Sequence, residues 1–150
     1  GRHALATRSH GRRLTAMETR LLDTCVVSYL LKKYPLAEPY HFLLNDDNLL
    51  LGLSFISLGE LYRWPLTKNW GDQRLREYEE ALKTYVVLWC DDMTCRWWAK
   101  VSAIKGRPMP VNDSWIAATA LRHDTPLVTH NVKDFIHLQP LGLKLITAIA

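Results

Sequence analysis

Three acidic residues in this chain have the type and spacing to do chemistry together. Asp23 directly follows a short apolar strand, Glu60 follows a longer apolar run, and Asp113 follows a loop broken by glycine and proline at 106–110. Each alone is explained by local structure, because acids commonly cap helices and stabilise their first turns. Brought to one place, three carboxylates repel one another unless a cation lies between them.

A cluster of this kind suits a hard divalent cation. Mg²⁺ and Mn²⁺ prefer oxygen ligands and retain several water molecules when they bind proteins. A metal held by carboxylates can orient a phosphodiester, neutralise the charge that develops on it and activate a water molecule for attack. Hydrolysis of a phosphoryl group is therefore the chemistry that these acids favour.

The elements that must position the acids alternate between strands and helices. Five apolar runs are typical of short β-strands, at 21–22, 49–57, 84–90, 127–129 and 144–150. Between them, apolar residues at three- and four-residue spacing predict helices after Asp23, from Asp72, across 91–105 and from about Asn112. This alternation predicts an α/β domain with a parallel sheet covered on both faces. In such sheets ligands bind beyond the carboxyl ends of the strands, where the three acids are expected to meet.

Polar residues at the predicted helix starts are interpreted first as caps. The predicted caps are Asp23 or Thr24, the S-x-x-E pair of Ser57 and Glu60, Asp72, and Asn112 or Asp113. On the last of these helices Asp113 shares a face with Ile116 and Ala117, so its carboxylate is expected to point toward the end of the sheet.

The length of 150 residues and the 48% hydrophobic content indicate one domain with an ordinary core. The net charge of +4 comes from residues 1–16, which hold four arginines and no acid, whereas the remainder is balanced. The charge is therefore weak evidence for a nucleic-acid partner. We expect the leader 1–16 to be disordered or not native to the domain, with a natural start at Met17; an organellar presequence is the alternative.

The cysteines Cys25, Cys90 and Cys95 are odd in number and lack the usual spacing of zinc ligands. They are predicted to be reduced thiols, two of them in apolar surroundings. No stretch approaches the roughly 20 apolar residues of a membrane span. The expected location is the cytoplasm.

The motifs around the acids resemble those of the PIN-domain ribonucleases, and most closely the VapC-type toxins of toxin–antitoxin pairs. The resemblance lies in LLDTCVVSYLL at 21–31, SFISLGELY at 54–62, and GRPMPVNDSWIAATAL with LVTHNVKDF within 106–135. These segments occur in the order and spacing of that family from about Arg20 to the C-terminus, so the resemblance covers nearly all of the domain at 17–150.

This resemblance implies a three-layer sandwich in which helices flank a five-stranded parallel sheet. It also implies a Mg²⁺- or Mn²⁺-dependent endoribonuclease, an RNA substrate, a cognate antitoxin and a homodimer, with no membrane association. The three family acids fall on Asp23, Glu60 and Asp113. Asp23 and Asp113 are the expected direct metal ligands, and Glu60 is expected to act through water or to orient the nucleophile.

Two positions depart from the family pattern. Cys25 stands where an Asn is frequent, and Asn131 stands where many members carry a fourth Asp, with Asp134 three residues later. Asn131 can form hydrogen bonds but adds no negative charge. Either Asn131 or Asp134 is expected to support the site, and the number of bound metals, one or two, stays open.

Other polar and aromatic residues are given simpler interpretations. Ordinary capping is the preferred role for Thr24 and Thr129, and contact with the site through their hydroxyls is the alternative. His130 is expected to be an exposed loop residue, and contact with RNA is the alternative. The tryptophans Trp97, Trp98 and Trp115 are assigned to core or dimer packing in preference to base stacking.

Two other functions are alternatives to the nuclease. The first is a PIN-like module that binds RNA or protein without cutting, which replacement of one of the three acids would favour. The second is another phosphate-handling α/β domain, such as a flavodoxin-like or phosphatase fold. The chain has no glycine-rich phosphate loop, and Cys25 occupies the position of the second acid found in many aspartyl phosphatases.

Overall fold

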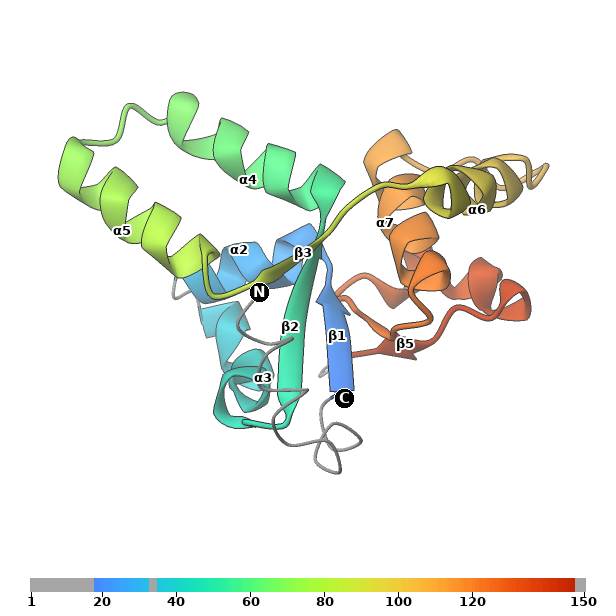
Figure 1. The fold of residues 1–150 in the computed structure, drawn as a ribbon, viewed down its shortest axis with the longest axis horizontal. Coiled ribbons are helices and arrows are strands. Elements are labelled where there is room, and N and C mark those ends of the chain that lie inside the picture. Colours follow the sequence, from blue (N-terminus) through green and yellow to red (C-terminus); the bar gives the residue numbers. More distant parts are fainter. Residues whose placement is uncertain (1–17, 33–34, 148–150) are drawn as a thin grey trace.

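The fold is built around one parallel sheet of five strands. A computed structural model describes residues 18–32 and 35–147. The strands are β1 (Glu18–Leu22), β2 (Leu49–Ser54), β3 (Val86–Leu88), β4 (Leu127–Val128) and β5 (Leu145–Ile146). Their order in the sheet is β3-β2-β1-β4-β5, and every neighbouring pair is parallel (Figure 1). The predicted α/β class and the five-stranded parallel sheet are confirmed.

The central strand β1 aligns its two neighbours at the site edge. Leu21 pairs with Gly52 of β2 and with Leu127 of β4, so the carboxyl ends of the three strands approach the same edge. One further bond extends this register beyond the strand, because the backbone N–H of Asp23 donates to the carbonyl of Val128 at 2.8 Å. The segments that follow β1 and β4 therefore begin side by side.

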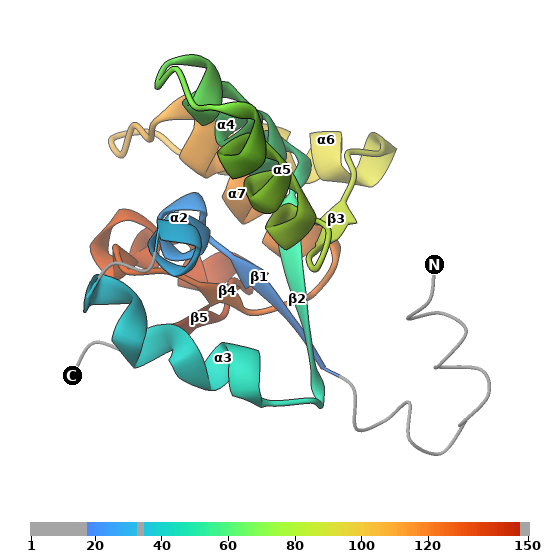
Figure 2. The same cartoon turned by 90° about the vertical axis from the view of Figure 1, so that its left-hand side faces the viewer.

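Helices cover both faces of the sheet. The α-helices are α2 (Thr24–Lys32), α3 (His41–Asn45), α4 (Phe55–Leu66), α5 (Asp72–Leu82), α6 (Asp92–Ser102) and α7 (Val111–Arg122). Three 3₁₀ helices, η2 (Pro35–Tyr40), η3 (Val132–Asp134) and η4 (Ile136–Leu141), complete the described elements. Figures 1 and 2 show α2, α3, α4 and α5 on one side of β1 and β2, with α4 running beyond the carboxyl end of β2, and Figure 1 shows α6 and α7 on the other side.

The alternation of side chains along β1 divides the core into two layers. Leu22 belongs to a cluster with Val26, Tyr40 and other residues of the first set of helices. Leu21 points the opposite way and belongs to a second cluster with Ile116 of α7 and Phe135. Both leucines are fully buried, which is what a strand covered on both faces requires. The result is the expected three-layer sandwich.

Three predicted helix starts are wrong. The strand β2 ends at Ser54, whose hydroxyl accepts from the Ile56 N–H and caps α4, so Ser57 lies inside the helix and forms no capping box with Glu60. The apolar residues Phe55 and Ile56 fit a strand or a helix equally well, and the position of Ser54 decides between them.

The other two errors concern the residue that stands just before the first helical turn. The helix α7 starts at Val111 after Pro110, which places Asp113 inside the first turn. The helix α5 begins at Asp72, and Gly71 occupies the N-cap position without a side-chain bond. An acid in a first turn still interacts favourably with the helix dipole. The two acids therefore did indicate where the helices start, but they lie within the first turn and not at the N-cap.

Some expectations fall outside the part of the chain that the structure describes. The leader 1–16 and the last three residues of the predicted fifth strand, 148–150, are among these. Within the described residues, none of the helices has the length and apolar character needed to cross a membrane.

Candidate active site

Asp23 occupies the turn between β1 and α2 and is almost completely enclosed, with 5% of its surface exposed. Its Oδ2 accepts a hydrogen bond from Thr129 Oγ1 at 2.7 Å and one from Cys25 Sγ at 3.4 Å. Burial raises the pKa of Asp23, these two bonds and a backbone bond from Thr24 lower it, and the charge of Glu60 raises it slightly. The net effect is an increase, which means that the carboxylate lacks full compensation for its lost hydration.

Glu60 comes from α4 and is held by a hydroxyl of α2. Thr24 Oγ1 donates to Glu60 Oε1 at 2.8 Å and lies 2.7 Å from Ser57 Oγ. Ser57 is fully buried one turn before Glu60 on the same helix. The Thr24 and Ser57 hydroxyls therefore join α2 to α4 beside the Glu60 carboxylate, which fixes Glu60 relative to the helix that begins just after Asp23.

Asp113 reaches the same region from α7. Burial, followed by the negative charges of Asp23, Asp134 and Glu60 in that order, raises the pKa of Asp113 to about 6. An electrostatic effect from all three indicates that the acids, which are far apart in sequence, lie near one another in space. The structure therefore places Asp23, Glu60 and Asp113 within electrostatic reach of one another.

The acids have no basic partner among the described residues. Each ion pair between described side chains involves other acids, such as Asp91 with Arg122 and Asp124 with Lys144. A group of carboxylates that is partly desolvated and lacks a counter-charge is what a divalent cation stabilises.

The carboxylates of the site are better suited to an ion that keeps part of its water shell than to one enclosed entirely by protein ligands. No three His, Cys, Asp or Glu side chains of residues 18–32 and 35–147 are arranged as a ready metal-binding group. Mg²⁺ is commonly held by only one or two carboxylates and completes its shell with water or substrate phosphate. The residues present therefore fit a hard ion that keeps several waters.

Cys25 and Asn131, the two residues that depart from the family pattern, are in contact in the structure. The Asn131 side-chain amide points to Cys25 Sγ at 3.9 Å, and the Asn131 backbone N–H donates to Thr129 Oγ1 at 3.0 Å. Burial, followed by the charge of Asp23, raises the pKa of Cys25 to about 12, so this residue is a neutral thiol that donates to Asp23. Asp134, in η3, contributes charge toward Asp113. Asn131 therefore supports Asp23 indirectly, and Asp134 acts on Asp113.

The hydroxyl residues of the site follow the alternative and not the preferred sequence interpretation. Ordinary capping was preferred for Thr24 and Thr129, but their hydroxyls bind Glu60 and Asp23. His130 was expected to be exposed, but it is half-buried, and its Nδ1 lies 3.0 Å from the hydroxyl of the buried Tyr40. The sequence signal that could have identified the threonines is their position at the carboxyl ends of β1 and β4.

The tryptophans pack against one another beside the site helix, as expected. Trp98 and Trp115 are stacked, with ring centroids 4.8 Å apart, and Trp98 Nε1 donates to Ser114 Oγ at 3.0 Å. These contacts join α6 to the first turn of α7, so they stabilise the segment that carries Asp113.

The comparisons with known proteins agree with this geometry. The family model for the PIN domain matches residues 20–139. The chain is 35% identical over 126 residues to Ribonuclease VapC1 of Haemophilus influenzae strain R2866, a match that covers 81% of this chain and 92% of the relative.

Solved structures have the same fold. VapBC-1 from nontypeable Haemophilus influenzae aligns with a TM-score of 0.71 and 31% identity, covering 87% of this chain and 98% of the other. A toxin–antitoxin complex from Klebsiella pneumoniae aligns with a TM-score of 0.68 and 19% identity, covering 87% and 98%. At that lower identity the second similarity is one of fold alone.

Replacing Thr129 with Val should raise the pKa of Asp23 further, because the variant keeps the size of the side chain and removes a bond that favours the charged carboxylate. A carbon-detected NMR titration of the Asp23 carboxyl group would measure this shift. Thr125→Val is the matched control, since Thr125 also loses a hydroxyl bond, to the Thr19 carbonyl, away from the acids. An unchanged Asp23 titration in Thr129→Val would remove Thr129 from its proposed role.

Asp113 should make the protein less stable as the pH rises. Its folded pKa of about 6 exceeds the ordinary value of 3.8, so the folded state binds more protons between these values and loses stability as they are released. In metal-free buffer near pH 8, Asp113→Asn should increase the free energy of unfolding by about 1 kcal/mol, a figure reduced for partial solvent screening. The gain should vanish near pH 4, where the wild-type side chain is largely neutral.

Urea denaturation at several pH values measures this difference. Asp124→Asn is the control, because Asp124 is an exposed acid just beyond the end of the same helix. A stability gain in Asp113→Asn that stays constant with pH would show that the charge of Asp113 is not its cause.

Proposed function

The chain belongs to the PIN domain family, and from this premise we propose that it is a metal-dependent endoribonuclease and the toxin of a toxin–antitoxin pair. The observation that carries the proposal is the gathering of Asp23, Glu60 and Asp113 near one edge of the sheet, with no basic side chain of residues 18–32 and 35–147 paired with them. The related Haemophilus protein is named a ribonuclease, which supports RNA as the substrate.

In the proposed site, Asp23 and Asp113 hold a Mg²⁺ or Mn²⁺ ion. When bound, such an ion supplies Lewis-acid stabilisation of phosphodiester charge and lowers the pKa of a bound water. Asp23 is suited to direct ligation because β1 and Thr129 fix its position, and the register of β1 with β4 restricts its movement. Asp113 is suited because its charge is otherwise uncompensated.

Glu60 has a different proposed role. The hydroxyl of Thr24 occupies one of its oxygens and orients the carboxylate, which leaves the other oxygen able to accept a hydrogen bond from water. A carboxylate held in this way can align an attacking water or accept its proton. Asn131 and Asp134 support this set from the segment after β4, Asn131 through Cys25 and Asp134 through its charge.

The proposed partners follow from the same relatives. The relative named Ribonuclease VapC1 and the solved structure named VapBC-1, 35% and 31% identical to this chain, support a cognate antitoxin for it. A homodimer is part of the proposal on family grounds. No membrane partner is proposed.

Asp113→Asn should reduce cleavage of RNA by more than about 100-fold, because loss of a supporting contact to a metal ligand alone commonly costs 10–100-fold. The measurement is fragmentation of a pooled structured-RNA substrate by protein that starts at Met17, with Mg²⁺, with Mn²⁺ and with EDTA. The wild type should cut only when metal is present.

Asp124→Asn should cut like the wild type, since its carboxylate is exposed and lies outside the site. Undiminished cutting by Asp113→Asn would contradict the assignment of Asp113. Folded wild-type protein that binds RNA but never cuts it would favour the binding module instead of the nuclease.

A further inference from the structure

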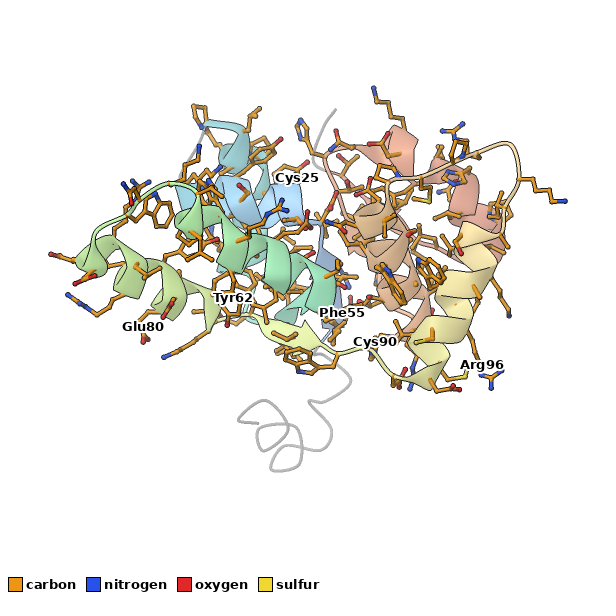
Figure 3. All side chains as sticks on the ribbon, turned by 90° about the horizontal axis from the view of Figure 1, so that it is seen from above. Cys25, Phe55, Tyr62, Glu80, Cys90 and Arg96 are labelled. Carbon is orange, nitrogen blue, oxygen red and sulfur yellow. The ribbon has the colours of Figure 1, made fainter. Side chains whose placement is uncertain are left out.

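Two cysteines outside the carboxylate site lie in contact on the surface. Cys90 follows β3, Cys95 lies in the first part of α6, and their sulfur atoms are 3.6 Å apart. Both side chains are exposed, so the expectation that two of the three cysteines lie in apolar surroundings is wrong. Figure 3 shows Cys90 where β3 leads into α6, well separated from Cys25 on α2.

The pair needs little movement to form a disulfide. A disulfide places its sulfur atoms about 2.05 Å apart, so the two sulfurs must approach by about 1.5 Å. Both side chains are exposed, so the approach takes place at the surface and not inside the core. The third thiol, Cys25, contacts Asp23 and Asn131 and has no such partner among the described cysteines.

The surroundings of the two thiols are not equivalent. Cys90 Sγ donates to the Asp91 carbonyl at 3.8 Å and contacts Cys95. Partial desolvation raises the pKa of Cys90, and the contact with Cys95 and the negative charge of Asp91 raise it further. The hydrogen bond that Cys90 donates to the Asp91 carbonyl favours its thiol form, so the first attack is assigned to Cys95.

We propose that Cys90 and Cys95 form a reversible dithiol–disulfide site that is oxidised by exchange with a small disulfide of the glutathione class. The Cys95 thiolate attacks one sulfur of the small disulfide, which forms a mixed disulfide and releases one small thiol. Cys90 then attacks the Cys95 sulfur, forms the protein disulfide and releases the second small thiol. The two protons of the protein thiols leave on the two released thiols, and the small disulfide is reduced by two electrons.

The bond would enclose the residue that caps α6. Asp91 Oδ1 accepts from the Thr94 N–H at 3.0 Å, and both carboxylate oxygens of Asp91 accept from the Arg122 guanidinium at the end of α7. A ring from Cys90 to Cys95 holds this cap in place and reduces the freedom of the unfolded chain. Oxidised protein should therefore unfold at a temperature about 5 °C higher than reduced protein.

The test uses the full chain, reduced and then incubated with oxidised glutathione, followed by intact mass measurement and peptide mapping. The wild type should lose the mass of two hydrogen atoms through a Cys90–Cys95 bond, and dithiothreitol should reverse the change. Cys90→Ser should instead retain one glutathione on Cys95, because the sulfur that resolves the mixed disulfide is absent. Cys25→Ser is the matched control and should form the bond as the wild type does.

Two results would overturn the proposal. One is wild-type protein that accumulates glutathione on Cys90 or Cys95 without closing the bond. The other is wild-type protein that keeps both thiols free under conditions that oxidise a small reference dithiol. Mass and mapping do not depend on RNA cleavage, so the outcome is independent of the proposed nuclease function.

Discussion

The structure depends on one electrostatic constraint: acidic side chains lie together in a partly buried place where no basic side chain of the described part of the chain pairs with them. Removing a carboxylate from water costs free energy, and placing a second one beside it adds repulsion. The raised pKa values of Asp23 and Asp113 are the direct expression of this cost. A protein retains such an arrangement only if something compensates for it, and the hydroxyl bonds to Asp23 and Glu60 compensate only in part.

The parallel sheet explains how acids so distant in sequence come together. The register of β1 with β4 places Asp23 beside Thr129, because the backbone N–H of Asp23 bonds to the carbonyl of Val128. The adjacent strand β2 leads directly into α4, which supplies Glu60. The helix α7 packs on the opposite face through Ile116 and Ala117 and carries Asp113 on its first turn. Each acid is thus held by an element whose own packing is independent of the site.

Local sequence patterns predicted the architecture and the acids but not the contacts between them. Apolar runs and helical spacing located all five strands and the main helices, because burial imposes those periods. The predicted start of α4 was wrong because Phe55 and Ile56 fit both the two-residue period of a strand and the 3.6-residue period of a helix. Only the surroundings of Ser54, which bonds to Thr119 of α7, show that the strand ends there and the helix begins. The bond from Thr24 to Glu60 joins residues 36 positions apart, so no local pattern could indicate it. The same holds for Thr129 with Asp23 and for the contact of Asn131 with Cys25.

Asp23, Glu60 and Asp113 are proposed to form one site for a hard divalent cation. Binding of Mn²⁺, measured by electron paramagnetic resonance, tests this proposal without any assumption about the substrate. The wild-type protein should bind Mn²⁺ near neutral pH, and Asp23→Asn should lose this binding. Binding should be weaker near pH 5, because Asp113, with a pKa of about 6, is then mostly protonated. Equal Mn²⁺ binding by the wild type and Asp23→Asn, with no dependence on pH, would contradict this proposal.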